Sequence, residues 1–205
     1  MAVLKANAYG LGAVGVADII KDQVNAFGVV GIKEALDLRN AGITKPIINL
    51  GIYSSDDAEM YLCNNISPSI FTYSALKNFE NIARGSKSPA NVWIKVDTGL
   101  NRLGIPCQEA AAFIHSVSDS KYLKIEGIYS TLSEDAEYDK EQMKSFYFLK
   151  KECETLKVKV PTWSIASSQA CFLSPEYGMD MPRLGISLLG YYPSKEAKKL
   201  NKIEL

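Results

Sequence analysis

The sequence has few of the residues that most often bind metals or form disulfides. It has one histidine, His115, on a helix-like segment where a surface or packed histidine is the ordinary role. Its four cysteines lie far apart and include no CxxC pair: Cys63, Cys107, Cys153 and Cys171. This scatter argues against a zinc site and against a disulfide framework, so we expect no metal and a reducing, cytoplasmic location.

The chain also lacks an excess of charge and long apolar runs. Its 23 basic and 23 acidic side chains cancel, which argues against a nucleic-acid partner, because phosphate binding needs a basic surface. No apolar run approaches the roughly 20 residues that span a bilayer. The start, Met1 to Lys5, is too short for the core of a signal peptide, so we expect no membrane association.

Apolar strand-like runs alternate with helical patterns along the 205 residues, a length that fits one large domain. The expected strands lie near residues 2–6, 26–30, 46–50, 67–71, 91–97, 124–130, 162–166 and 183–189. The expected helices lie near residues 13–23, 33–41, 56–63, 73–83, 108–117, 140–156 and 168–173.

This alternation predicts an α/β fold with parallel strands, either a closed (β/α)8 TIM-type barrel or a doubly wound open sheet. The number of strands favours the barrel, and no G-x-G-x-x-G follows the first strand to support a dinucleotide fold. No helix precedes the first strand, so we expect a barrel lacking that helix, with a poorly covered seam between its last and first strands.

Lys5 is the most informative residue. The short apolar run Ala2–Leu4 brings it to the carboxyl end of a strand, and a turn containing Gly10 and Gly12 follows. An enzyme that forms a Schiff base keeps its amine at such a place. A solvated lysine at the end of a strand is the alternative.

A second lysine is expected inside the barrel. In the strand Val92–Asp97, Lys95 and Asp97 alternate with apolar residues and so share the inward face. Burying a cation is costly unless it is paired or modified, so an inward Lys95 implies either a modification or an ion pair with Asp97.

Three further clusters have the chemistry of anion binding. The loop Gly99–Gly104 carries Arg102, whose guanidinium suits a phenolate or carboxylate. Ser167 and Ser168 stand where a strand enters a helix, so they either bind an anion or only cap the helix. Gly185, after Arg183, allows the backbone to approach a ligand closely.

Four motifs occur together in one order: Lys5–Gly10, Lys95–Gly104, Gly127–Ser130 and Gly185–Ser194. From residue 2 to about residue 194 the chain resembles the pyridoxal-phosphate barrel domain of bacterial alanine racemases, the fold-type III class. The resemblance implies a PLP-binding (β/α)8 barrel over residues 1–194. It also implies that residues 195–205 are a tail or the start of a C-terminal β-domain that this chain lacks.

The resemblance implies pyridoxal 5'-phosphate as cofactor and gives roles to particular residues. Lys5 would hold the cofactor through an imine and act as the base on one face of the substrate, and Arg102 would bind the phenolic oxygen and orient the substrate. Lys95 matches a lysine that is often carbamylated in the family. The cofactor contacts implied are Lys5, Tyr9, Arg102, Ser168, Arg183, Gly185 and Ile186.

The implied reaction is racemisation of a small amino acid, namely interconversion of L- and D-alanine for cell-wall supply. The family uses a second base, a tyrosine from the C-terminal domain of the partner subunit, so the resemblance also implies a homodimer. Two alternatives remain: a catalytically impaired PLP-binding fragment or binding module, and a barrel for another phosphorylated ligand in which Lys5 is structural.

The sequence departs from the family mainly at histidine positions. Leu11, Thr131 and Ser164 stand where the family has histidine, and Leu184 stands where proline is common. The position of Thr131 belongs to the network that links the cofactor ring to the second base. The substitutions are therefore expected to affect turnover more than cofactor binding.

Overall fold

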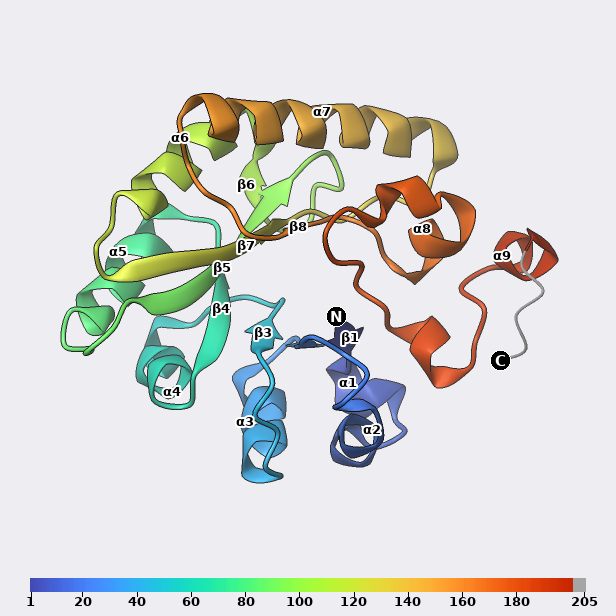
Figure 1. Ribbon diagram of the computed structural model, residues 1–205, viewed down its shortest axis with the longest axis horizontal. Helices are drawn as coiled ribbons and strands as arrows, with labels where there is room; N and C mark the ends of the chain where they lie inside the picture. Colours follow the sequence, from blue (N-terminus) through green and yellow to red (C-terminus); the bar gives the residue numbers. More distant parts are fainter. Residues whose placement is uncertain (201–205) are drawn as a thin grey trace.

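The structure, a computed structural model, describes residues 1–200, and its strands curl into a parallel barrel (Figure 1). The strands are β1 (Ala2–Val3), β2 (Phe27–Val29), β3 (Ile47–Asn49), β4 (Ile66–Ile70), β5 (Ala90–Asp97), β6 (Ile105–Pro106), β7 (Leu123–Tyr129) and β8 (Trp163–Ser164). They pair in the order β1-β2-β3-β4-β5-β7-β8, and β6 lies beside the end of β5. Every pairing between these strands is parallel, as the alternation of strands and helices predicts.

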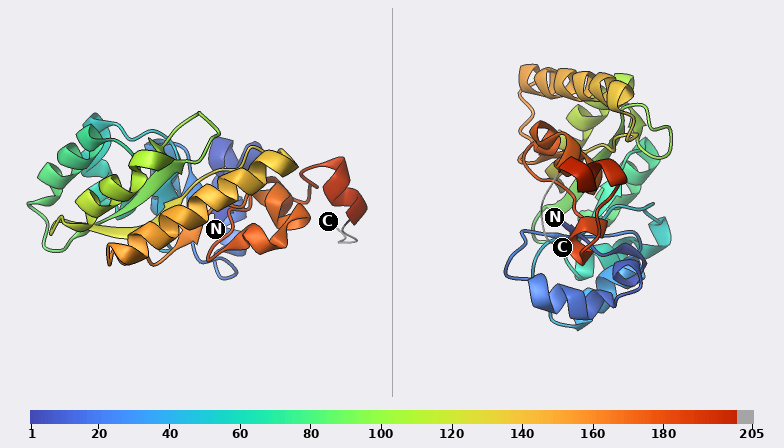
Figure 2. Two further views of the ribbon diagram at one scale, coloured as in Figure 1. Left: turned by 90° about the horizontal axis from the view of Figure 1, so that it is seen from above. Right: turned by 90° about the vertical axis from the view of Figure 1, so that its right-hand side faces the viewer.

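Helices lie around the outside of the strands (Figures 1 and 2). They are α1 (Lys5–Tyr9), α2 (Ala13–Ile20), α3 (Ile32–Asn40), α4 (Ala58–Cys63), α5 (Tyr73–Ala83), α6 (Cys107–Ser118), α7 (Ala136–Thr155), α8 (Ser168–Leu173) and α9 (Lys195–Leu200), with 3-10 turns at Ser55–Asp57, Pro175–Gly178 and Ile186–Leu189. The predicted helices are confirmed; α7 begins earlier than predicted because Asp135 caps it. None of the helices described within residues 1–200 is long and apolar enough to cross a bilayer.

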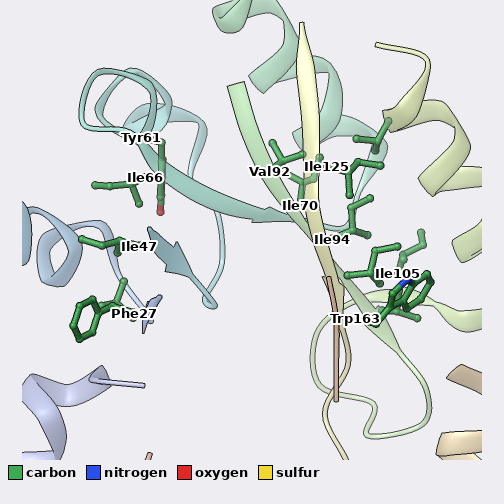
Figure 3. Packing of buried hydrophobic residues seen from close by; sticks show 14 of the residues in the cluster. Phe27, Ile47, Tyr61, Ile66, Ile70, Val92, Ile94, Ile105, Ile125 and Trp163 are labelled. Atoms are coloured by element: carbon green, nitrogen blue, oxygen red, sulfur yellow. The ribbon is translucent and has the colours of Figure 1, made fainter. Parts of the chain in front are cut away.

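The main hydrophobic core lies between the strands and the helices that cover them. Ile47 of β3 and Ile66 of β4 are register partners in this layer, and Ile94 of β5 belongs to the same core (Figure 3). Phe146 of α7 packs edge-on against Trp163 of β8, with ring centroids 5.3 Å apart. Burial of this apolar surface, at about 25 cal/mol per Å², is the main force that holds helices to strands.

A second, smaller core fills the inside of the barrel. It consists of Met1, Ala26, Ile48, Trp93 and Tyr129. Gly127 makes room for it, because a Cβ at position 127 would lie 2.5 Å from the Trp93 ring. These side chains pack together inside the described part of the barrel, as is usual for parallel α/β barrels, whose ligands bind at the carboxyl ends of the strands.

The prediction of a last strand over residues 183–189 is wrong in extent. Only Leu184 makes a bridge, to Ala2, and a 3-10 turn begins directly after Gly185. The seam is nevertheless joined by backbone hydrogen bonds: Val3 N donates to Leu184 O (2.7 Å), and Arg183 N donates to Ala166 O (3.0 Å). The first strand is also shorter than predicted, because the backbone turns left-handed after Lys5.

The charged tail predicted after residue 194 begins with the short helix α9, which lies beside α8 at the edge of the molecule (Figures 1 and 2). The remainder of that predicted segment, residues 201–205, lies outside the described residues.

Arg39 of α3 joins two loops at the amino ends of the strands, and replacing it should destabilise the barrel. Its guanidinium donates to the carbonyls of Ile43, Lys45, Asn64 and Asn65 at 2.7–2.9 Å. We expect Arg39→Ala to lower the free energy of unfolding by about 2–3 kcal/mol, because hydrogen bonds made by charged groups are strong. Urea unfolding measures the loss. A midpoint equal to that of the exposed control Lys33→Ala would contradict this role.

Candidate functional site

A cavity of about 570 Å³ lies at the carboxyl ends of the barrel strands. The lysines and the cofactor contacts that the resemblance implies all line it: Lys5, Tyr9, Lys95, Arg102, Ser168, Arg183, Gly185 and Ile186. These residues come from both ends of the chain and from its middle. The closed arrangement of strands is what brings them to one place.

A left-handed turn places Lys5 and Tyr9 on the same side. Ala6, Asn7, Ala8 and Tyr9 all have φ between 51° and 55°, which costs roughly 1–2 kcal/mol for each non-glycine residue. The turn is held by its own hydrogen bonds, among them Ala13 N to Asn7 Oδ1 (2.8 Å). The Lys5 amine lies 5.7 Å from the centre of the Tyr9 ring, so both side chains face the cavity.

One end of the cavity is lined by hydroxyl and amide groups. Gly185 N donates to Ser168 Oγ (3.1 Å), and Ser187 Oγ donates to the same oxygen (2.9 Å). The Tyr9 hydroxyl lies so close to Gly185 that a Cβ there would meet it at 2.2 Å. Partial burial raises the pKa of Tyr9, so its hydroxyl stays protonated and can donate a hydrogen bond to an anion.

Arg183 is buried under the cavity and is fixed by several acceptors. Nη1 donates to Ser164 Oγ (2.8 Å), and Nη2 donates to Ser130 O (2.6 Å) and to Thr131 Oγ1 (3.3 Å). Burial lowers the pKa of Arg183 to about 10, which still leaves the side chain cationic at neutral pH. A rigid guanidinium therefore faces the cavity from below.

Lys95 is the second buried cation, and only 3% of its surface is exposed. Its amine donates to Thr131 Oγ1 (3.2 Å). Desolvation lowers the pKa of Lys95 to about 7, with further contributions from Arg183 and Arg102. At neutral pH a large share of this amine is therefore uncharged and nucleophilic.

Asp97 is not the partner of Lys95, contrary to the ion pair considered from the sequence. Within residues 1–200 no ion pair joins the two side chains, and Asp97 does not line the cavity. Its carboxylate instead accepts from Gly99 N (2.9 Å) and Asn101 N (3.1 Å). Asp97 thus shapes the loop that carries Arg102 to the cavity.

Tyr129 belongs to the motif Gly127–Ser130, but no role in the site was predicted for it from the sequence. Its ring lies 4.6 Å from the Lys95 amine and 5.1 Å from the Arg183 guanidinium carbon. Its hydroxyl lies within hydrogen-bonding distance of two acceptors, Leu50 O (3.0 Å) and Ser69 Oγ (2.9 Å). The ring therefore makes cation–π contacts with both side chains. Their attraction to the ring offsets part of the electrostatic repulsion between Lys95 and Arg183.

The cavity carries mostly positive charge. Lys5, Lys95, Arg102 and Arg183 line it, and Glu134 is the one carboxylate among its described lining residues. Glu134 was not expected from the sequence, which has no motif around it; its Oε1 accepts from Ser167 Oγ (3.1 Å). This balance favours an anionic ligand.

The positions where the sequence departs from the expected histidines are of two kinds. Thr131 and Ser164 both contact Arg183 directly, and Thr131 also contacts Lys95. Leu11 is 59% exposed. Hydroxyls thus support the buried arginine of this chain.

The fold and cavity define a class: a parallel α/β barrel with a largely cationic cavity at the carboxyl ends of its strands and a lysine at the rim. The donors fit pyridoxal phosphate, because the cavity offers hydroxyl and amide donors at the Tyr9–Gly185 contact and an amine that lines the same cavity. Within residues 1–200 no three His, Cys, Asp or Glu side chains are grouped to hold a metal ion.

Comparison with known proteins identifies the family. The model of the alanine racemase N-terminal domain matches residues 1–193. An alanine racemase of Desulforamulus reducens is 36% identical over 97% of this chain and 55% of its own length. The alanine racemase structure from Clostridium difficile 630 superposes with a TM-score of 0.95 at 30% identity, over 100% of this chain and 58% of that one. A histidine racemase of Leuconostoc mesenteroides gives 0.88 at 28% identity, over 100% and 56%.

This chain belongs to the alanine racemase N-terminal domain family, which depends on pyridoxal phosphate. It spans about half the length of the curated relatives that it matches.

The lowered pKa of Lys95 predicts a pH-dependent reactivity. Its folded pKa of about 7 lies well below that of an ordinary lysine, so its neutral fraction rises as the pH passes through 7. Acetylation of Lys95 by acetic anhydride should therefore approach its maximal rate near pH 8, whereas the lysine of a short model peptide, with a pKa of about 10.4, should still react faster at pH 9 than at pH 8. Peptide mass spectrometry at several pH values measures both. Parallel profiles for the two lysines would contradict the assigned environment.

The contact between Gly185 and Tyr9 predicts a second effect. In Gly185→Ala the new methyl group must displace the Tyr9 hydroxyl. We expect the dissociation constant for pyridoxal phosphate to rise about tenfold, the equivalent of one hydrogen bond to a charged group. Absorbance titration measures the change, with Gly15→Ala in α2, where no atom lies within 4 Å of the added carbon, as control. Equal affinity in the two variants would argue against a ligand contact here.

Proposed function

We propose that this chain is the cofactor-binding barrel of a pyridoxal-phosphate-dependent amino-acid racemase that interconverts L- and D-alanine. One observation supports the proposal above the others: a single cavity joins Lys5, the hydroxyl and amide donors near Gly185, and the buried guanidinium of Arg183. Those groups match the aldehyde, the phosphate and the ring nitrogen of the cofactor in turn.

The proposed cofactor contacts follow from the donors present. Tyr9, Ser168 and the backbone of Gly185 and Ile186 would hold the phosphate, while Lys5 would bind the aldehyde carbon covalently. Arg102, on the loop fixed by Asp97, would contact the phenolic oxygen and orient the substrate carboxylate. When bound, pyridoxal phosphate supplies the electron sink that makes the α-hydrogen of an amino acid acidic.

Lys5 is proposed to move the proton on one face of the substrate α-carbon. Racemisation also needs an acid/base on the other face. Tyr129 does not serve, because it is 2% exposed and its hydroxyl is directed at Leu50 O and Ser69 Oγ. We propose that a partner subunit supplies this group in a homodimer, as a tyrosine.

Arg183 would face the pyridine nitrogen of the cofactor. A guanidinium gives up a proton far less readily than a carboxylic acid, so it would donate a hydrogen bond and leave the nitrogen unprotonated. Ser164, Thr131 and the Ser130 carbonyl fix its orientation. This choice limits how strongly the ring withdraws electrons and so disfavours reactions other than proton exchange.

Lys95 is proposed to carry a carbamate. Its neutral amine would add to carbon dioxide and release a proton, which converts a buried cation into an anion. The product would pair with Arg102, whose charge already lowers the pKa of Lys95. This would remove the unfavourable proximity of Lys95 and Arg183 above Tyr129.

The wider setting is part of the same proposal. Residues 1–194 would be the PLP-binding domain, and residues 195–205 would lead away from it. The substrate would be a small amino acid, and the protein would act in the cytoplasm, in the supply of D-alanine for the cell wall, without nucleic acid or membrane partners.

A second candidate function is cofactor binding without turnover. It is favoured by the cavity itself, whose described lining residues include only two tyrosines, Tyr9 and Tyr129. Tyr191, 61% exposed, does not line the cavity.

Borohydride reduction in the presence of pyridoxal phosphate tests the proposal. We expect a stable adduct at Lys5 by peptide mass spectrometry, together with an absorbance near the visible edge that Lys5→Ala abolishes. Lys33→Ala serves as the control. Labelling of other lysines with Lys5 unmodified would instead favour a barrel for another phosphorylated ligand.

Exchange of the alanine α-hydrogen with deuterium oxide separates the two candidate functions. Exchange with inversion supports the racemase, and exchange with retention shows that Lys5 works without a second base. Cofactor binding with no exchange at all would contradict the racemase and leave the binding module.

A further inference from the structure

Glu34 of α3 lies outside the cavity and yet contacts the turn that carries Lys5. Its Oε1 accepts from the backbone N–H of Ala6, the residue directly after Lys5, at 2.7 Å. Its Oε2 accepts from Val30 N, at the end of β2, at 2.9 Å. One carboxylate thus joins the Lys5 turn to the neighbouring strand end, where Val30 also lines the cavity.

Helix capping accounts for only half of this arrangement. Glu34 is in the first turn of α3, where an acidic side chain commonly accepts a preceding backbone N–H. The bond to Val30 N is of that kind. The bond to Ala6 N spans 28 residues of sequence and has no part in capping α3.

The turn that Glu34 contacts is strained, and its internal hydrogen bonds are joined by one from outside, between Ala6 N and Glu34 Oε1. Its residues 6–9 are all left-handed, a conformation that non-glycine residues avoid. Lys5 is exposed at the rim, so the direction of its amine depends on the turn that follows it, which also carries the Tyr9 ring that the amine faces. The backbone of the turn is what sets that direction, and Ala6 N is its first amide after Lys5.

We propose that Glu34 is a positioning residue for Lys5: by accepting from Ala6 N and Val30 N together, its carboxylate holds the left-handed turn at the rim and so directs the Lys5 amine into the cavity. The proposal rests on the proposed function, in which Lys5 binds the aldehyde of the cofactor.

Two variants and a matched control test it. Glu34→Gln keeps a single acceptor oxygen and presents an amide NH2 to the other N–H, so it cannot satisfy both donors. Glu34→Asp keeps both oxygens but is shorter by one methylene. Thr72→Ala removes a side-chain bond to Ala75 N (3.1 Å) at the start of α5, outside the cavity, and so loses a helix cap alone.

The first readout is the rate at which borohydride traps pyridoxal phosphate on Lys5 at a subsaturating cofactor concentration. We expect Glu34→Gln to lower it about tenfold, the effect of losing one hydrogen bond to a charged acceptor. Glu34→Asp should restore part of the rate, and Thr72→Ala should match the wild type. Equal trapping in Glu34→Gln and Thr72→Ala would overturn the proposal.

The second readout is hydrogen–deuterium exchange of residues 5–10, which needs no cofactor. We expect faster exchange of this segment in Glu34→Gln than in Thr72→Ala, and unchanged exchange in β5. Unchanged exchange at residues 5–10 would overturn the proposal even if trapping fell. Should the wild type never be trapped at Lys5, the proposed function fails, and the exchange measurement then decides the role of Glu34 by itself.

Discussion

The backbone bonds between the first and last parts of the chain are the constraint on which the site depends. Val3 donates to Leu184 O, and Arg183 donates to Ala166 O. These few bonds bring Lys5 and Tyr9, from one end of the sequence, against Arg183 and Gly185 from the other. If the barrel opened at this seam, the cavity would lose one wall and the Tyr9–Gly185 contact with it.

Four basic side chains line the cavity, and two of them, Lys95 and Arg183, are buried. Lys95 and Arg183 lie over one aromatic ring, and desolvation lowers the pKa of each. Two buried cations so close together repel each other, and a bound anion would offset that repulsion. The charge that lines the cavity therefore suits an anionic ligand.

Much of this could be predicted from the sequence, because its signals are local or periodic. Alternation of strands and helices predicted a barrel or an open parallel sheet, and the number of strands favoured the barrel. Alternation within residues 92–97 predicted that Lys95 turns inward. The motifs around Lys5 and Arg183 predicted the cavity lining. The last strand was wrong, since an apolar run containing Gly185 reads as a strand but folds as one bridge and a 3-10 turn.

What the sequence could not reveal depends on contacts between distant residues. Tyr129 reads as an ordinary strand residue, and only the closed barrel shows it beneath two cations. Asp97 could have paired with Lys95, but the loop amides of Gly99 and Asn101 bind it instead. Glu34 reads as a helix cap, and its second bond becomes visible only when Ala6 turns left-handed.

The most direct measurement of the central claim is a crystal structure of this chain grown with pyridoxal phosphate. We expect continuous electron density from Lys5 Nζ to the aldehyde carbon, with the phosphate at Tyr9, Ser168 and Gly185. A cofactor bound elsewhere, or bound in the cavity with Lys5 directed into solvent, would contradict it.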